Sequence, residues 1–222
     1  MDPAADTVVA LEADGRKVRG DRTRRTILAA AVNIASVEGL EGLTIGRLAT
    51  ELKMSKSGLF AHFGSKEELQ ISTVRAAAAI FAQRVILDAQ ERHEPGLVRL
   101  KAVLDRWLEY MERETFAGGC FFSAASIEMD GRPGPVRDAV AAQVSRWAEL
   151  LAEYAGAAIE RGELEPGTDA EQLAFELDAF GMAVNAGWQL HGDAAVLDRG
   201  RRAVARRLLA DATAGGRAAL AA

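Results

Sequence analysis

The chain has 222 residues, of which 49% are hydrophobic and 27% carry a charge, with a formal net charge of -5. These proportions are ordinary for a soluble globular protein and exclude disorder over most of the length. The longest uncharged stretch, residues 179–192, is too short for a membrane span, which needs about 20 mostly apolar residues. The acidic N-terminus has no secretory signal pattern, so we expect a cytoplasmic protein that does not enter the membrane.

Residues that carry metal or catalytic chemistry are few. Cys120 is the one cysteine, and the three histidines, at positions 62, 93 and 191, have no recognised zinc spacing. The sequence contains no GxSxG, HExxH, P-loop or GxGxxG pattern. We therefore expect no metal, no cofactor and no enzymatic activity.

Charge is distributed unevenly along the chain. Residues 16–75 hold eleven Lys or Arg against six Asp or Glu, a balance of +5, whereas residues 76–222 hold sixteen against twenty-two, a balance of -6. A basic segment attached to an acidic body is typical of a protein that binds a polyanion locally. Apart from Phe60 and Phe63, the aromatic residues lie after residue 75, which indicates two modules with a boundary there.

Helical spacing of apolar residues begins near Arg22. It predicts a first helix of about four turns over residues 22–37, which Gly39 and Gly42 bring to an end. Two short helices are predicted next, over residues 44–51 and 55–62. Each begins at a hydroxyl side chain of the kind that caps helices, Thr44 for the first and Ser55 for the second.

The rest of the chain continues the helical pattern. Ser65 followed by Glu68 is a capping-box pattern, which predicts a long helix that extends to about Gln90. Steps of three and four between apolar residues predict further helices near residues 97–111, 136–154, 168–190 and 194–213. Alternation of the kind found in strands is not sustained anywhere, so an all-α fold is predicted.

The functional prediction depends on residues 44–66. Two short helices joined by a tight turn at Lys53 and Met54 have helix-turn-helix spacing, with Ala49 and Leu59 where the helices would cross. The N-terminal end of the second helix carries exposed polar residues of the kind that meet base edges. A purely structural helical corner is the alternative, and the local positive charge favours DNA binding over it.

This segment resembles the TetR family of transcriptional regulators over residues 22–75, about a quarter of the chain. The resemblance rests on Ile45, Leu48, Ala49, Met54, Ser55, Leu59, Phe60, His62, Phe63, Lys66 and Leu69. It implies a homodimeric repressor that binds a palindromic operator in double-stranded DNA and releases it when a small molecule occupies the C-terminal domain. The implied organisation is a flexible arm (1–21), a helix-turn-helix domain (22–75) and a ligand-binding and dimerisation domain (76–222).

The resemblance also assigns DNA contacts. Side chains facing the major groove from the second helix would be Lys56, Ser57, Gly58 and His62. Phosphate contacts at helix N-termini would come from Thr44 and Lys66. The cap Ser55 and the aromatic pair Phe60 and Phe63 complete the predicted set, although both phenylalanines are expected to pack rather than to read bases.

Two positions depart from the family pattern. Lys53 stands where the family often has Gly, and would cost about 1 kcal/mol if its φ is positive, or would contact a phosphate. Phe60 stands where the family often has Tyr and lacks the hydroxyl for a phosphate bond. A basic run before the first helix would either follow the DNA or remain a solvated tail: Arg16, Lys17, Arg19, Arg22, Arg24 and Arg25.

Aromatic residues after residue 75 are candidates to line a ligand cavity between helices. The predicted set is Phe81, Trp107, Tyr110, Phe116, Phe121, Phe122, Trp147, Tyr154, Phe175 and Trp188. Each of them can equally well be a core residue. As a set they favour an effector that is small and apolar or aromatic. Candidates for a few polar contacts are Tyr110, Ser123, Asn185 and Gln189.

Dimerisation is predicted through the helices over residues 168–190 and 194–213, in which Gly181, Ala183 and Gly187 would permit close helix approach. An arginine-rich run in the second of these helices is expected to be a solvated face or to form ion pairs between protomers. Three alternatives remain: an activator, a DNA-binding protein without a ligand, and a redox-sensing regulator that uses Cys120. The neighbouring Phe121 and Phe122 suggest that Cys120 is buried, which disfavours the redox alternative.

Overall fold

The computed structural model describes the backbone of residues 3–221 and the side chains from residue 22 to residue 221. Within this part the structure is helical, apart from one isolated antiparallel bridge between Leu164 and Ala212. The all-α prediction is therefore confirmed. The N-terminal helices are α1 (Pro3–Gly42), α2 (Ile45–Leu52), α3 (Lys56–Phe63) and α4 (Lys66–Phe81). The remaining elements are the π-helical turn η1 (Ala82–Ile86), α5 (Leu87–Arg92), α6 (Leu97–Glu112), α7 (Phe121–Met129), α8 (Pro135–Glu160), α9 (Ala170–His191), α10 (Ala195–Asp211) and α11 (Ala214–Ala221).

Helix boundaries differ from the sequence prediction mainly at the N-terminus. α1 begins at Pro3 rather than at Arg22, so the backbone of the predicted arm, as far as it is described, continues the helix. The side chains of residues 1–21, including Arg16, Lys17 and Arg19 of the basic run proposed to contact DNA, lie outside the described side chains, whereas Arg22, Arg24 and Arg25 lie within them. The predicted domain boundary near residue 75 falls inside α4, which is continuous from Lys66 to Phe81.

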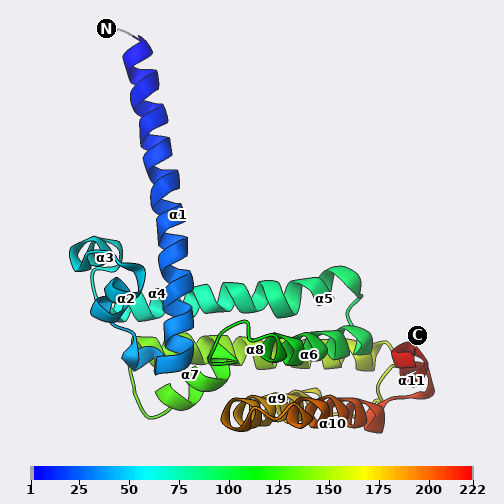
Figure 1. The fold of residues 1–222 in the computed structure, drawn as a ribbon. Coiled ribbons are helices and arrows are strands. Elements are labelled where there is room, and N and C mark those ends of the chain that lie inside the picture. Colours follow the sequence, from blue (N-terminus) through cyan, green and yellow to red (C-terminus); the bar gives the residue numbers. More distant parts are fainter. Residues whose placement is uncertain (1–2, 222) are drawn as a thin grey trace.

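The helices form stacked layers (Figure 1). α2 and α3 lie beside α1 at one end of the molecule, and α11 lies at the other end. α4 packs on α8, α8 packs on α6 and α9, and α10 packs on both α6 and α9. One connected set of buried apolar residues runs from Ile27 in α1 to Ala212 after α10, so the helix-turn-helix unit and the helical body share a core.

Glycines in α9 and α10 permit close packing within the protomer. A Cβ added at Gly181 would lie 1.9 Å from the Trp107 ring, and one at Gly187 would lie 3.0 Å from Val196. The structure thus corrects the prediction that Gly181 and Gly187 permit close approach of a second protomer. The space beside these glycines is occupied by side chains of α6 and α10 of the same protomer. Ala183, in contrast, is exposed on the outer side of α9.

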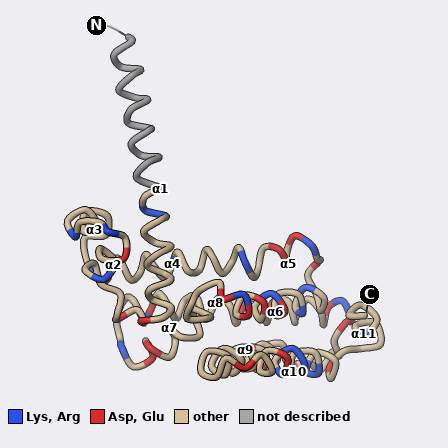
Figure 2. Tube along the Cα trace, viewed as in Figure 1, with Lys and Arg blue, Asp and Glu red and all other residues tan. Residues whose placement is uncertain are grey.

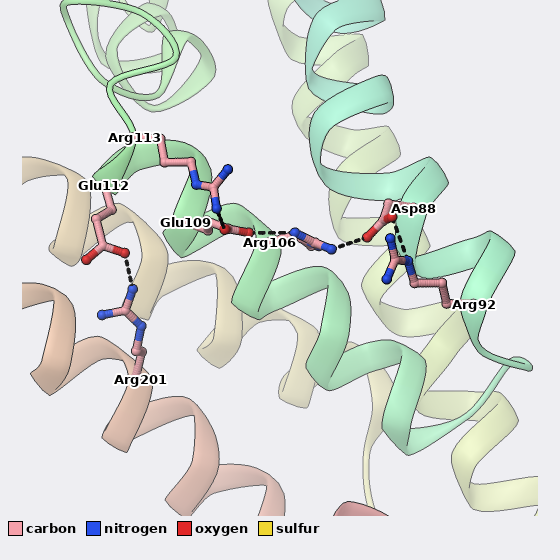
Figure 3. A network of polar contacts seen from close by, with 7 residues as sticks. All are labelled: Asp88, Arg92, Arg106, Glu109, Glu112, Arg113 and Arg201. Carbon is pink, nitrogen blue, oxygen red and sulfur yellow. Dashed lines mark hydrogen bonds and ion pairs between the residues drawn. The ribbon is translucent and has the colours of Figure 1, made fainter.

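Charged residues on the helical body form paired networks. Figure 2 shows both signs of charge interspersed along α6 and α10. In the network of Figure 3, Arg106 on α6 pairs with Asp88 on α5 and with Glu109, and Arg201 on α10 pairs with Glu112 on α6. Arg201 and Arg207, from the predicted arginine run, therefore pair within the protomer, Arg207 with Glu176 and Asp211. Individual exposed pairs contribute little to stability, but the Arg106 pairs connect α5 to α6 and the separate Arg201 pair connects α10 to α6.

Candidate DNA-binding and effector sites

The turn between α2 and α3 has the geometry expected from its sequence. Thr44 caps α2, and its Oγ1 accepts a hydrogen bond of 3.0 Å from the Arg47 N–H. α2 ends at Lys53, which is left-handed with φ 52° and ψ 38°, and the next amide, of Met54, donates to the Ala49 carbonyl at 3.0 Å. A side chain in this conformation costs about 1 kcal/mol relative to glycine. The strain predicted for Lys53 is thus present, and the lysine side chain is exposed.

α3 presents its N-terminal end to solvent and its other face to the core. The Ser55 Oγ caps it by accepting from the Gly58 N–H at 3.1 Å. Leu59 is fully buried and Phe63 is 6% exposed, so these two residues fix the helix. Lys56 and Ser57 are exposed in its first turn, in the part of the unit where Figure 2 shows basic segments.

Arg24 holds α3 against α1 and α4. Its guanidinium lies 4.7 Å from the centre of the Phe63 ring, donates to the His62 carbonyl at 2.7 Å and donates to the Ser72 Oγ at 3.2 Å. The sequence grouped Arg24 with the arm that would follow DNA. In the structure the Arg24 guanidinium is instead bound within the helix-turn-helix unit. Its stacking and hydrogen bonds fix the orientation of α3, the helix predicted to read the bases and called the recognition helix below.

Two further basic side chains near the α2–α3 unit are already paired. Arg47, which the sequence prediction missed, binds Glu38 and Glu51, each at 2.8 Å, and these hydrogen bonds raise its pKa. Lys66, a predicted phosphate contact, pairs with Glu41 at 3.0 Å, and this hydrogen bond lowers the pKa of Glu41. To contact a phosphate, Lys66 must therefore exchange Glu41 for the phosphate. Because this ion pair is half-exposed, breaking it costs little free energy.

The ten predicted DNA-contact residues fall into three groups by exposure. Exposed residues are Thr44, Lys53, Ser55, Lys56, Ser57 and Phe60; half-buried ones are Gly58, His62 and Lys66; Phe63 is buried. The packing role expected for Phe63 is confirmed. Phe60, for which the same role was expected, is 56% exposed on α3 and lies on the surface of the unit.

A cavity of about 350 Å³, partly open to solvent, lies in the helical body. Four of the predicted aromatic residues line it: Phe81, Trp107, Phe122 and Trp147. The Trp147 ring packs edge to face on the rings of Phe81 and Trp107. Residues from α4 through α9 complete the wall, the polar ones being Gln90, Ser123, Ser126, Gln143, Arg146 and Asp178.

The other predicted aromatic residues do not line this cavity, whereas the polar candidate Ser123 does. Tyr110 and Phe121 are buried behind the wall, and Tyr110 packs edge to face on Phe81 with ring centres 5.5 Å apart. Tyr154 does not line the cavity itself, but its hydroxyl accepts a hydrogen bond of 2.8 Å from the side-chain amide of Gln90, which does. Phe175 is 69% exposed on α9, and Trp188 is half-buried elsewhere on α9. The abundance of aromatic residues thus predicted part of the cavity wall. Which rings line the cavity depends on the face of the helix that carries each residue.

Three polar groups in the cavity wall are informative. Cys120 is buried and its Sγ accepts from the Trp107 indole at 3.4 Å, so the exposed thiol that a redox sensor needs is not present. The Ser123 Oγ is buried without a hydrogen-bond partner among the described residues. Burial raises the pKa of Asp178, against the opposing effect of the hydrogen bond from the Trp147 indole.

A helix-turn-helix unit joined through a shared core to a helical body with a cavity between its helices defines a DNA-binding regulator. Two family comparisons agree: residues 27–72 match "Bacterial regulatory proteins, tetR family", and residues 96–204 match "Tetracyclin repressor-like, C-terminal domain". The chain belongs to the TetR family of DNA-binding transcriptional regulators. None of the described helices has the length and apolar character that crossing a membrane requires.

Relatives of known structure or function support this assignment. The HTH-type transcriptional repressor NicS of Pseudomonas putida is 41% identical over 101 residues, a match that spans 46% of this chain and about half (48%) of that relative's length. A TetR transcriptional regulator from Chloroflexus aurantiacus has a TM-score of 0.81 at 26% identity, covering 87% of this chain and 98% of its own. AibR, solved with isovaleryl coenzyme A and operator DNA, has a TM-score of 0.64 at 21% identity, covering 80% and 95%.

Proposed function

We propose that the protein is a homodimeric repressor that binds a palindromic operator through α3 and leaves it when a small apolar or aromatic molecule enters the cavity. The observation that carries this proposal is the course of α4. This helix begins at Lys66, next to the recognition helix, and ends at Phe81, whose ring lines the cavity. A ligand that favours a different position of α4 would therefore change the placement of α3 on DNA.

DNA recognition is assigned to the exposed end of α3. Lys56 and Ser57, with His62 one and a half turns on, would read bases in the major groove, and Gly58 would permit close approach of the backbone. Thr44, Lys53 and Lys66 would position the unit on phosphates. The known repressor NicS favours repression over activation, and a regulator of this kind would act on DNA in the cytoplasm.

The dimer is assigned to the outer face of α9. Exposed apolar side chains recur along it at steps of three and four: Phe175, Ala179, Ala183, Ala186 and Leu190. Phe175 is 69% and Leu190 77% exposed, which is unusual for large apolar residues unless another surface covers them. Small residues between two large ones let a second α9 approach closely, and pairing with α10 would complete four helices.

The effector is assigned from the cavity wall. A volume of about 350 Å³ is at the small end of ligand sites, and four aromatic rings provide apolar contact. Ser123 and Asp178 add polar contacts that would orient the ligand.

The test of this proposal is release of a labelled operator by a panel of small neutral aromatic compounds, small aromatic acids and highly charged phosphorylated compounds. Release by the aromatic compounds, together with quenching of tryptophan fluorescence, supports the proposal, and release by highly charged compounds alone contradicts it.

Replacing Asp178 with Asn is expected to stabilise the protein at neutral and alkaline pH. Because burial raises the pKa of Asp178 in the folded state, the folded protein retains this proton to a higher pH than the unfolded chain does. The carboxyl group therefore favours folding most below its unfolded pKa, near 3.8, and this contribution is lost as pH rises through the folded pKa. Asn keeps an oxygen for the Trp147 indole and does not ionise.

Thermal unfolding of both proteins at about pH 4 and about pH 8 checks this expectation. The midpoint of Asp178→Asn should exceed that of the wild type at the higher pH, and the difference should shrink at the lower pH. A difference that is the same at both pH values, or a more stable wild type at the higher pH, would contradict it.

A further inference from the structure

The carboxylate of Glu128, at the end of α7, binds the backbone of the segment that leads into the helix-turn-helix unit. Its Oε2 accepts from the Leu40 N–H at 2.7 Å and its Oε1 accepts from the Glu41 N–H at 2.8 Å. These two amides lack helical partners because Gly39, with φ 78° and ψ 166°, interrupts α1. A carboxylate on consecutive free N–H groups forms charge-assisted hydrogen bonds, which are stronger than neutral ones.

Gly39 is required for this arrangement in two ways. Its positive φ is unfavourable for other residues, and a Cβ there would lie 2.7 Å from the Glu128 Oε1. The Leu40 carbonyl is held as well, by the Gln70 side-chain amide of α4 at 2.6 Å. The turn is therefore fixed by α7 on its amides and by α4 on its carbonyl, and it ends immediately before Thr44, the cap of α2.

The same short helix also forms part of the cavity wall. Phe122, Ser123 and Ser126 of α7 line the cavity, and Ser126 precedes Glu128 by two residues. The loop before α7 is also tied to α1, where the Gly118 N–H donates to the Ser36 Oγ at 3.2 Å. A molecule in the cavity that displaces α7 must therefore shift the Glu128 carboxylate with it or break its two hydrogen bonds.

We propose that Glu128 is a positioning residue that transmits occupancy of the cavity to the helix-turn-helix unit by way of the Leu40 and Glu41 amides. This inference rests on the proposed function, since it names a regulatory residue of the same site. It adds a second connection beside the continuous helix α4. Loss of the Glu128 contact therefore removes the part of the cavity's effect on operator binding that passes through α7.

Because the effector is unidentified, the test fills part of the cavity with a larger side chain of the protein itself. Val144 on α8 lines both the cavity and a neighbouring pocket that Ser126 also lines, so Val144→Phe adds a ring beside α7 without substituting a residue of α4 or α7. Operator affinity is measured by fluorescence anisotropy for the full-length wild type, Val144→Phe, Glu128→Gln and the double variant. Asp130→Asn is the matched control, because it removes the same charge from an exposed side chain two residues away that lines the same neighbouring pocket as Val144. Circular dichroism and thermal unfolding establish that each variant is folded.

We expect Val144→Phe to weaken operator binding about 10-fold in the wild type and in the Asp130→Asn background, and less than about 3-fold in the Glu128→Gln background. Equal weakening in all backgrounds would overturn the proposal and assign transmission to α4. No weakening in the wild type would overturn it too, because the cavity would then not act on the operator.

Amide hydrogen exchange separates failure of this inference from failure of the proposed function, because it needs no DNA. Val144→Phe should speed exchange at Leu40 and Glu41 in the wild type, and Glu128→Gln should speed it without any further effect of Val144→Phe. Unchanged protection of both amides in Glu128→Gln would overturn the inference even if operator binding is normal. A wild type that binds no operator contradicts the proposed function, and the exchange result then decides the role of Glu128.

Discussion

Ala183→Glu is expected to convert the protein to a monomer at micromolar concentration and to weaken operator binding by at least about 100-fold. Ala183 lies at the centre of the exposed apolar face of α9, so a second protomer would bring two carboxylates together in an apolar interface. Two recognition helices must reach half-sites about 34 Å apart, and a monomer engages only one of them. Loss of the second half-site removes the gain that comes from linking two binding events.

Sedimentation and fluorescence anisotropy on the same preparation check this expectation. Because Ala183 is exposed, its replacement should change the stability of the protomer by less than about 0.5 kcal/mol. Ala142→Glu, at an exposed position of α8, provides the matched control and should remain dimeric with unchanged operator affinity. A wild type that sediments as a monomer, or an Ala183→Glu dimer with normal affinity, would contradict the assigned interface.

Gly118→Ala is expected to destabilise the protein by about 3 kcal/mol, which lowers the unfolding midpoint by about 6 to 12 °C for a chain of this size. A Cβ at this position would lie 1.8 Å from the backbone oxygen of Ser36 in α1. Since backbone cannot rotate away as a flexible side chain does, the loop before α7 must move. That movement also breaks the Gly118 hydrogen bond to the Ser36 Oγ.

Gly131→Ala is the control for this substitution, because no atom lies within 4 Å of the added Cβ and its φ is not positive. Its stability should stay within about 0.5 kcal/mol of the wild type. Equal unfolding midpoints for Gly118→Ala and Gly131→Ala would show that the loop before α7 is not closely packed on α1.

The helix-turn-helix unit could be predicted from the sequence because its determinants are local. Thr44 and Ser55 cap their helices through hydrogen bonds to residues three positions on, and such spacing is visible in the chain itself. α7 was not predicted, since its sequence, FFSAASIEM, is apolar or small on nearly every side and has no helical periodicity. Its position between the cavity and α1 is a tertiary property, as is the use of Arg24 to hold α3.

The cavity could be predicted only in part. The sequence indicates that aromatic residues are abundant after residue 75, but it does not show which faces of the helices converge. Trp107 enters the wall because Gly181 lets α9 approach α6 at this ring, whereas Tyr110, three residues on, is turned into the core. Ser123 was among the polar candidates and does line the cavity, whereas Asp178 has no sequence signal of a site, since isolated polar residues occur on most helices.

Selection of bound fragments from genomic DNA by the purified protein tests the central claim, sequence-specific binding through α3, most directly. The wild type is compared with Lys56→Ala plus His62→Ala at low and high salt, and we expect it to enrich a palindrome. The double variant should lose this enrichment, with affinity about 100-fold lower, and wild-type binding should fall steeply as salt rises. Enrichment of the same sequence by the double variant, or no enriched sequence with the wild type, would contradict the claim.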